Sequence, residues 1–241
     1  MKIYGKNVAL EALKENKKIH KIYLNNKFKD DEILSLIERK NINTKILDNR
    51  ELDKMCKGLH QGIILEVEDI KTYSFDEIIP NITTEYPLIV ILDHLEDPHN
   101  LGAMIRTANQ AGAHGVIIPK RRAVGLTATV ARTSAGALNY TPVAKVTNLV
   151  KTMEDLKKKG LWFVCADMDG DVMYDVNMKG PIGLVIGNEG EGVGRLVKDT
   201  CDFTARIPMK GDIDSLNASV AAGVLAYEIV RQRMILGPTS A

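Results

Sequence analysis

The 241-residue sequence contains little cysteine and no long hydrophobic run, and each shortage excludes a class of protein. Its three cysteines, Cys56, Cys165 and Cys201, are far apart and form no CxxC pair, which argues against a disulfide framework and a zinc site. No apolar run approaches the roughly 18 residues that a bilayer-spanning helix needs. Asn7 and Glu11 interrupt the N-terminus where a signal peptide would need an apolar stretch. We therefore expect a cytoplasmic protein with reduced thiols.

The chain also lacks a strong excess of either charge. The formal net charge is +1, so charge alone does not indicate a nucleic-acid-binding protein. Residues 1–72 carry 15 Lys and Arg against 12 Asp and Glu, a net +3, whereas the remainder carries 17 against 19, a net −2. This asymmetry is weak support for RNA contact in the N-terminal part. Possible phosphate contacts there, each explained as well by a solvated surface, are Lys2, Lys6, Lys17, Lys18, Lys21, Lys27 and Lys29.

The first seventy residues alternate between helical and strand patterns, which predicts a compact αβαβαβ unit. The predicted elements are a helix at 5–16, a strand at 21–25, a helix at 31–40, a strand at 44–48, a helix at 50–58 and a strand at 62–69. The stretch 71–86 shows no clear periodicity. We predict an N-terminal domain at 1–70, a linker at 71–86 with room for a short helix, and a second domain at 87–241.

The second domain begins with a strand, "LIVILD", that is too apolar to be exposed on either face. Such strands are typical of a parallel sheet that is covered by helices on both sides. The expected elements are strands at 88–93, 115–119, 161–167, 182–187 and 206–209, and helices at 100–113, 127–138, 149–160 and 215–235. This alternation predicts an α/β domain with a mostly parallel sheet.

A glycine-rich stretch, "GNEGEGVG" at 187–194, follows one of these strands. Its spacing fails the dinucleotide-binding pattern, because the position three beyond Gly192 is Arg195, and it lacks the GK[ST] ending of a phosphate-binding loop. Glu189 and Glu191 would repel a polyphosphate. The loop therefore suits a ligand that is not strongly anionic, at the carboxyl end of a strand. A plain glycine turn before a helix near Val193 explains the pattern as well.

A polar turn and a helix follow the first strand, in "LDHLEDPHNLGAMIRTANQAGA". Asn100 is a candidate N-cap of that helix. Arg106 lies among apolar residues, so it must either pair with an acid at the surface or point into a cleft. His94 and His99 flank two acids, but such a pair is more often a solvated turn than a metal site, and we expect no bound metal.

A third stretch, "IPMKGDIDSLNASVAAG", precedes and begins the long C-terminal helix. Ser215 is a good candidate N-cap for that helix. Asn217, Ala218 and the small residues that follow keep the helix narrow, which allows another backbone or a ligand to pack closely.

Together, the three stretches resemble the SpoU branch of the SPOUT RNA methyltransferases. The match consists of Asn100 to Arg106, then Gly187, Glu189 and Gly190, then residues 207–223, in the family's order across 88–235. The segment "IYGKNVALEAL" also resembles the small substrate-binding domain of members that methylate a guanosine ribose of bacterial large-subunit (23S) ribosomal RNA.

This resemblance implies a ribose 2′-O-methyltransferase that uses S-adenosylmethionine, with a C-terminal trefoil knot and a homodimeric assembly. By match, the cofactor would be held by Gly187, Gly190, Ile207 and Leu216, largely through backbone groups. Arg106 takes the position of the family's catalytic arginine. The resemblance also implies that the arginine, the loop and the target ribose are oriented by Asn100, Glu189, Ser215 and Asn217.

Several alternatives remain open from the sequence. The substrate could instead be transfer RNA or another ribosomal nucleotide. A non-catalytic RNA-binding factor for ribosome assembly is a rival of another class, as is a nucleotide-dependent oxidoreductase. The intact Arg106, Glu189 and Asn217 argue against the first rival, and the failed dinucleotide spacing argues against the second.

Overall fold

The computed structural model describes residues 1–14, 18–56, 58–82, 84–212 and 215–235. Contacts divide the chain into two compact units, Met1–Ile70 and Lys71–Ala241. Each unit has its own sheet, so each is described by itself.

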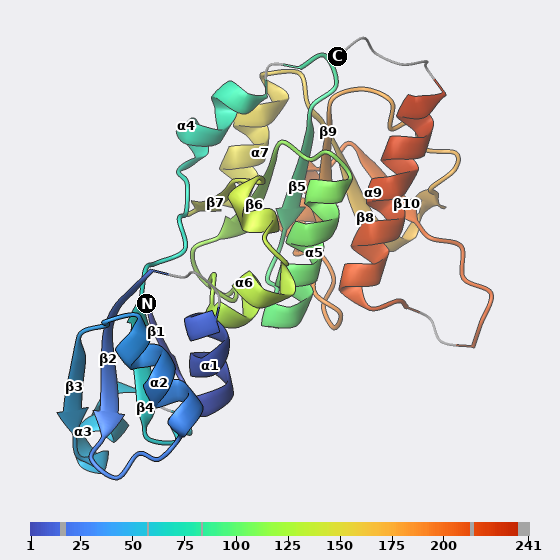
Figure 1. Ribbon diagram of the computed structural model, residues 1–241. Coiled ribbons are helices and arrows are strands. Elements are labelled where there is room, and N and C mark those ends of the chain that lie inside the picture. The colour runs from blue at the N-terminus through green and yellow to red at the C-terminus, as the bar shows by residue number, and fades with distance from the viewer. Residues whose placement is uncertain (15–17, 57, 83, 213–214, 236–241) are drawn as a thin grey trace. The chain divides into compact units, whose positions relative to one another are not determined.

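The first unit contains a four-stranded sheet in the order β1-β4-β2-β3 and three helices (Figure 1). Its elements are β1 (Lys2–Tyr4), α1 (Lys6–Lys14), β2 (Ile19–Asn25), α2 (Asp31–Arg39), β3 (Thr44–Leu47), α3 (Asn49–Met55) and β4 (Ile63–Val67). The sequence pattern missed β1, whose three residues pair antiparallel with β4. β2 pairs parallel with β3 and antiparallel with β4. The third helix was predicted to end at Gly58 but ends at Met55. Residues 15–16 of the first predicted helix lie outside the described residues.

The second unit contains a six-stranded sheet in the order β10-β8-β9-β5-β6-β7, and every described pair in it is parallel. Its strands are β5 (Leu88–Leu92), β6 (Gly115–Pro119), β7 (Val143–Val146), β8 (Trp162–Val172), β9 (Ile182–Ile186) and β10 (Phe203–Arg206). Its helices are α4 (Phe75–Ile78), η1 (Ile79–Asn81), α5 (Pro98–Gln110), α6 (Ala128–Thr133), η2 (Ala137–Asn139), α7 (Leu149–Lys157), α8 (Arg195–Thr200) and α9 (Ala218–Met234). The prediction of an α/β fold with a parallel sheet is confirmed.

One strand was missed and two strand boundaries were wrong because pairing, not local pattern, sets them. β7 had no predicted counterpart, β8 continues to Val172, and β10 ends at Arg206 where a strand was predicted to begin. β10 pairs with both parts of β8 through a register shift between Thr204 and Ala205. The predicted helix at 127–138 is a short α6 followed by the separate η2 turn.

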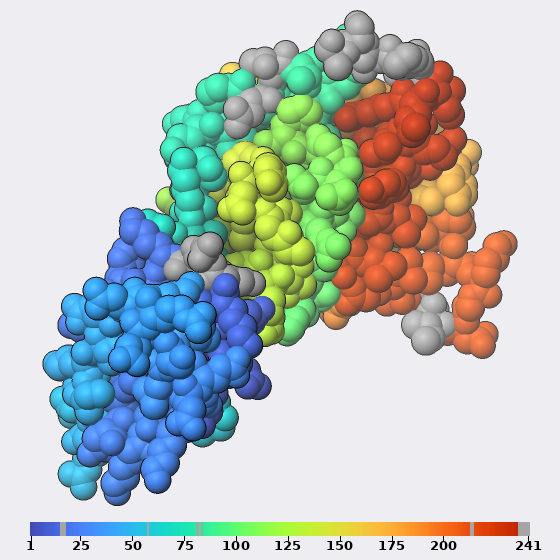
Figure 2. Space-filling model, in the orientation of Figure 1, coloured from blue at the N-terminus to red at the C-terminus, as the bar shows by residue number. Residues whose placement is uncertain are grey.

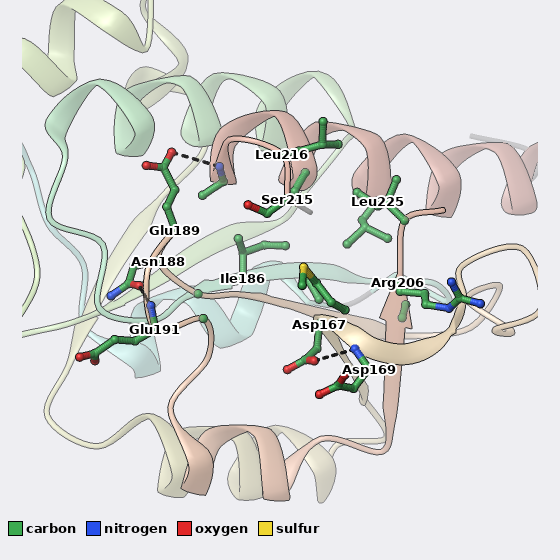
Figure 3. A pocket seen from close by; sticks show the side chains of 18 of the residues that line it. Asp167, Asp169, Ile186, Asn188, Glu189, Glu191, Arg206, Ser215, Leu216 and Leu225 are labelled. Atoms are coloured by element: carbon green, nitrogen blue, oxygen red, sulfur yellow. Dashed lines mark hydrogen bonds between the residues drawn. The ribbon is translucent and has the colours of Figure 1, made fainter. Parts of the chain in front are cut away.

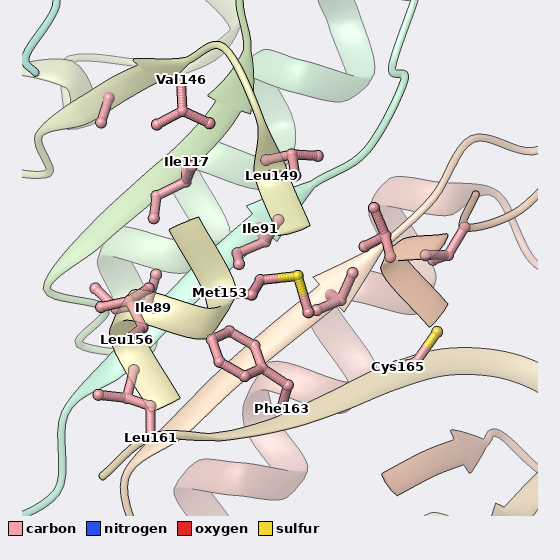
Figure 4. Close-up of a cluster of buried hydrophobic side chains, with 14 of the residues drawn as sticks. Ile89, Ile91, Ile117, Val146, Leu149, Met153, Leu156, Leu161, Phe163 and Cys165 are labelled. Atoms are coloured by element: carbon pink, nitrogen blue, oxygen red, sulfur yellow. The ribbon is translucent and has the colours of Figure 1, made fainter. Parts of the chain in front are cut away.

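Helices cover both faces of the second sheet (Figure 1). One face packs on α4, α7 and α8, and the other on α5 and α9, with α6 packed against α5. Every residue of β5 is buried, as its apolar sequence predicted. Figure 4 shows the core on the α7 side, where Met153, Leu156 and Phe163 fill the space between helix and strands. A Cβ on Gly183 would come within 2.2 Å of the Phe163 ring, so this core requires glycine there.

The stretch 71–86, for which the sequence predicts a linker, adds structure to the second unit. Tyr73 forms a parallel bridge with Ala144 on the outer side of β7, and the side chain of Ile78 is fully buried. This segment therefore covers the backbone of an edge strand, which would otherwise be free to pair with another chain.

The helix starts differ from those predicted. The N-cap of α5 is Asp97, whose carboxylate accepts from the backbone N–H of His99 and Asn100, with Pro98 as the first helical residue. Asn100 is thus inside the helix and its side chain is free for another contact. The helix predicted near Val193 begins at Arg195. In the part of the chain described, no helix is both long and apolar enough to cross a membrane.

Candidate active site

Three side chains from three distant stretches meet in one hydrogen-bonded group at the carboxyl end of the parallel sheet. Asn100 Nδ2 donates to Glu189 Oε1 at 3.1 Å, and Asn217 Nδ2 donates to Asn100 Oδ1 at 3.1 Å. Asn217 Nδ2 also donates to Glu189 Oε1 in a short contact. The structure therefore brings together one polar residue from each of the three motifs found in the sequence.

This group also starts α9. Asn217 is the N-cap of the helix, and its Oδ1 accepts from the backbone N–H of Ser219 at 3.0 Å and Val220 at 3.3 Å. The prediction that Ser215 caps this helix was wrong, because the chain reaches helical geometry only at Ala218. The carboxylate of Glu189 accepts from the backbone N–H of Ala218 at 3.3 Å. A negative charge at a helix N-terminus is favourable because the unpaired N–H groups there carry partial positive charge.

The glycine loop at 187–194 is folded tightly against itself. A Cβ on Gly187 would lie 2.0 Å from the backbone of Gly192. Only glycine at position 187 therefore allows the two ends of the loop to come this close. The side chain of Asn188 holds the turn, since its Oδ1 accepts from the backbone N–H of Gly190 and Glu191. The sequence attributed the glycines to close approach by a ligand; Gly187 is needed by the loop itself.

Asp93, which the sequence analysis did not select, anchors the far end of this loop. Its side chain is fully buried, and its Oδ2 accepts from the backbone N–H of Gly194 at 2.8 Å. Its Oδ1 lies 2.6 Å from Nδ1 of His94. An acid that ends a wholly apolar strand was the available clue, because a carboxylate buried at the edge of a sheet needs partners.

A cavity of about 470 Å³ lies beside the loop, between the ends of β8, β9 and β10 and the start of α9 (Figure 3). All four residues that the resemblance selected for cofactor binding line it: Gly187, Gly190, Ile207 and Leu216. Ile186 and Leu225 add apolar walls, and Ser215 lies at the same cavity. The structure therefore groups the predicted cofactor residues around one space.

The cavity wall is acidic. Its described lining contains the carboxylates of Asp167, Asp169, Glu189 and Glu191 and one guanidinium, that of Arg206. Lys198 pairs with Asp167 at 2.6 Å, so carboxylates remain in excess. Burial raises the pKa of Asp167, but hydrogen bonds from Lys198 and from the backbone N–H of Asp169 outweigh it and leave this pKa below its ordinary value. The carboxylate is thus charged at neutral pH. Such a wall favours a cationic ligand over a polyphosphate.

Arg106 stands apart from the hydrogen-bonded group. It lies on α5, two turns after Asn100, and its side chain is exposed. Within the described ranges, no hydrogen bond or ion pair holds its guanidinium, and it does not line the cavity of its own chain. The sequence expected a partner or a cleft for this residue. Its guanidinium is instead available to a molecule outside the chain.

The polar turn before α5 does not form a metal site in the described structure. Among the residues described, no group of three or more His, Cys, Asp or Glu side chains is placed to hold a metal ion. Asp97 of this turn is occupied as a helix cap, and His94 contacts Asp93.

Comparison with known proteins decides the family. A model described as the SpoU rRNA Methylase family matches residues 87–227, and one described as RNA 2′-O ribose methyltransferase substrate binding matches residues 2–73. The chain belongs to the SpoU rRNA methylase family. The resemblance seen in the sequence is confirmed, and the chain is a SpoU/TrmH-type RNA methyltransferase.

Curated and solved relatives of this SpoU-family chain cover most of its length. A putative TrmH family tRNA/rRNA methyltransferase of Bacillus subtilis, YacO, is 44% identical over 98% of this chain and 97% of its own. The crystal structure of the SpoU methyltransferase AviRb from Streptomyces viridochromogenes in complex with AdoMet superposes with a TM-score of 0.67 at 26% identity, covering 98% of this chain and 91% of that one. A TrmH/SpoU tRNA modifying enzyme of A. aeolicus covers 68% of this chain and 84% of its own, with a TM-score of 0.57 at 27% identity.

The lysines that the sequence offered as phosphate contacts are placed unequally in the first unit. Lys6, Lys27 and Lys29 line one hollow of about 530 Å³, together with Phe28 and polar side chains. Lys6 lies 5.2 Å over the Phe28 ring. Lys18 is paired with Glu68, and Lys21 lies over Tyr23. Lys17 falls outside the described residues.

Proposed function

We propose that this RNA methyltransferase transfers a methyl group from S-adenosylmethionine to a ribose 2′-hydroxyl, and that its substrate is a guanosine of large-subunit ribosomal RNA. The observation that carries the proposal is the meeting of Asn100, Glu189 and Asn217 beside the acidic, glycine-walled cavity. The 2′-hydroxyl as acceptor is supported by the description of the model that matches residues 2–73.

The cavity fits the cofactor on three grounds. Its volume, about 470 Å³, lies in the range of small-molecule pockets. Glycine backbone at Gly187 and Gly190 and the side chains of Ile207 and Leu216 suit a flat adenine and ribose. The excess of carboxylates suits a ligand with a sulfonium and an ammonium group. A similar protein was crystallised with AdoMet, which supports the same cofactor here.

When bound, S-adenosylmethionine supplies an already activated methyl group. The protein's remaining task is to position the hydroxyl and assist the loss of its proton. Arg106 would hold the adjacent phosphate and stabilise the developing alkoxide, because a guanidinium resists deprotonation. Asn100, Glu189 and Asn217 would fix the loop against α9, and Ser215 lies at the cavity where it can contact cofactor or ribose.

We further propose that the enzyme acts as a homodimer in the cytoplasm. An exposed apolar row on α9 supports the dimer: Val220, Tyr227 and Met234 are 49%, 51% and 75% exposed. They are seven residues apart, so they lie on one helix face. α9 forms part of the surface in Figure 2, beside α5. The expected trefoil knot is supported by the contact of the 187–194 loop with the start of α9.

The support for ribosomal RNA is the matched family description, while the name of the Bacillus subtilis relative includes both tRNA and rRNA. The test uses tritiated S-adenosylmethionine with ribosomal and transfer RNA from a strain that lacks the modification. Label should map to one guanosine ribose of the large-subunit RNA. Label on transfer RNA would support the proposed methyl transfer but show that the substrate is not ribosomal RNA. Cofactor binding without label on either RNA would favour a non-catalytic RNA-binding factor.

A further inference from the structure

A second polar region of the catalytic unit, which the mechanism above does not use, is strongly basic. A hollow of about 780 Å³ lies between the ends of β6 and β7, the start of α7 and the segment before α4. Lys120, Lys145 and Lys151 line it. Arg121 and Arg122 follow Lys120 in the loop and are exposed. We name these residues the basic rim: Lys120, Arg121, Arg122, Lys145 and Lys151.

The basic rim is not neutralised within the described structure. None of its five side chains forms an ion pair or a side-chain hydrogen bond among the residues described. Two acids near the hollow have other direct partners, while Asp155 also attracts Lys151 at longer range. Asp155, which lines the hollow, pairs with Lys158 at 2.9 Å, and Glu77 accepts from Ser74. Three of these cations line the hollow and two follow Lys120 in the loop. Their mutual repulsion destabilises the free protein, and an anionic ligand would relieve it.

The backbone places the basic rim at the same edge of the sheet as the candidate active site. β6 and β7 end there, as do β8 and β9, because all the strands are parallel. Lys120 donates its backbone N–H to Val146 at the end of β7, and Val124 of the same loop donates to Leu95 in the turn that leads to Asn100. β6 and β7, which lead to Lys120 and carry Lys145, are two and three strands from β9, roughly 10 and 14 Å at the usual strand spacing.

We propose that the basic rim binds consecutive phosphates of the substrate RNA and guides the strand toward the cavity. The proposal rests on the RNA methyltransferase function and adds a second RNA contact, within the catalytic unit itself. Lysine and arginine side chains that lie in solvent without partners are suited to backbone phosphates, which carry no sequence information. The basic rim would therefore raise affinity and orient the strand, and base recognition would come from elsewhere.

The test measures RNA affinity against salt concentration for Lys145→Gln/Lys151→Gln. The probes are a fluorescent oligouridylate for binding and unmodified large-subunit RNA for methyl transfer. Each lost phosphate contact should lower the slope of log affinity against log salt by about 0.7. We expect roughly tenfold weaker binding of the double variant and a raised KM for RNA, with kcat, S-adenosylmethionine affinity and melting temperature unchanged.

The matched control is Lys159→Gln/Lys179→Gln, which removes the same charge at the opposite edge of the sheet, after the end of α7 and before β9. Equal slopes for the two double variants would overturn the proposal. Inorganic phosphate tests whether the site instead binds a small free anion. The proposal is also wrong if phosphate binding depends on Lys145 and Lys151 while the salt dependence of RNA affinity is the same in the double variant and the wild type. Wild-type protein that methylates no RNA would instead contradict the proposed function.

Discussion

Asn100 donates a 3.1 Å hydrogen bond to the carboxylate of Glu189, although 89 residues separate them in the chain. The same carboxylate oxygen accepts from Asn217 and from the backbone of Ala218. One oxygen thus holds together the start of α5, the glycine loop and the start of α9. A change in that oxygen should affect the loop and the helix together.

Glu189→Gln should lower methyl transfer by more than its loss of stability explains. Glutamine keeps one acceptor oxygen but removes the negative charge at the α9 N-terminus, which costs about 0.5–1 kcal/mol. Its amide also brings a donor where three donors already converge. The measurement pairs urea unfolding with turnover at saturating S-adenosylmethionine. Glu191→Gln is the control, because the Glu191 carboxylate makes no hydrogen bond among the residues described. If the loss of turnover equals the loss of folded protein, Glu189 stabilises the start of α9 and has no further role in methyl transfer.

Arg106→Ala should lower turnover by roughly 10²–10⁴-fold, about 3–5 kcal/mol in activation free energy. Cofactor affinity should change little, because Arg106 does not line the cavity. Single-turnover assays and calorimetric titration with S-adenosylmethionine measure the two quantities. Arg106→Lys should be intermediate, since lysine keeps the charge but not the planar fork of donors. Near-normal transfer by the alanine variant would remove Arg106 from the mechanism.

Gly187→Ala should disrupt the fold of the loop, whereas Gly190→Ala should leave that fold intact. The added methyl at Gly187 would overlap the Gly192 backbone, and backbone cannot move aside as a flexible side chain can. At Gly190 the nearest atom, Asn188 Oδ1, is 3.8 Å away. We expect the first variant to lose about 1–3 kcal/mol of unfolding free energy and most of its cofactor affinity. Equal unfolding free energies of the two variants would contradict the loop geometry.

Asn217→Ala should destabilise α9, and Ser215→Ala should not. Asn217 caps the helix and lies in the hydrogen-bonded group, so its removal should cost about 1 kcal/mol or slightly more. Ser215 precedes the cap and is exposed, so its replacement should stay within about 0.5 kcal/mol. Chemical denaturation compares the two. A larger loss of unfolding free energy in Ser215→Ala than in Asn217→Ala would indicate that Ser215 is the N-cap.

Glu228 should give the folded state an acid-sensitive stabilisation. Hydrogen bonds from Arg231 lower the pKa of this buried carboxyl below its ordinary 4.5, against the opposing effect of burial, and Gln232 adds to the lowering. Because the folded pKa is the lower one, this stabilisation is present above pH 4.5 and is lost as the pH falls through the folded value. Glu228→Gln should therefore differ most from wild type at neutral pH. A stability difference that stays constant down to pH 3 would rule out this coupling.

Much of the fold could be predicted from local pattern. The wholly apolar β5 indicated a parallel sheet covered on both faces, and amphipathic stretches marked α2 and α7. Strands that depend on pairing with a neighbouring strand were missed or misplaced. β1 is only three residues long, and β10 pairs with β8 through a shift in register. The energy that orders such segments comes from the neighbouring strand, which the local sequence does not contain.

For the site, the sequence by itself determined which residues were candidates, because Asn100, Glu189 and Asn217 stand in three recognisable motifs. Only the tertiary structure decided what each of them does. In the structure, Asn217 and not Ser215 caps α9, and the packing of the loop requires glycine at position 187. Asp93 binds the far end of the loop, and the side chain of Arg106 is exposed. The physical reason is distance along the chain: hydrogen bonds that span 28 to 117 residues depend on how the strands and helices pack, and no local spacing encodes them.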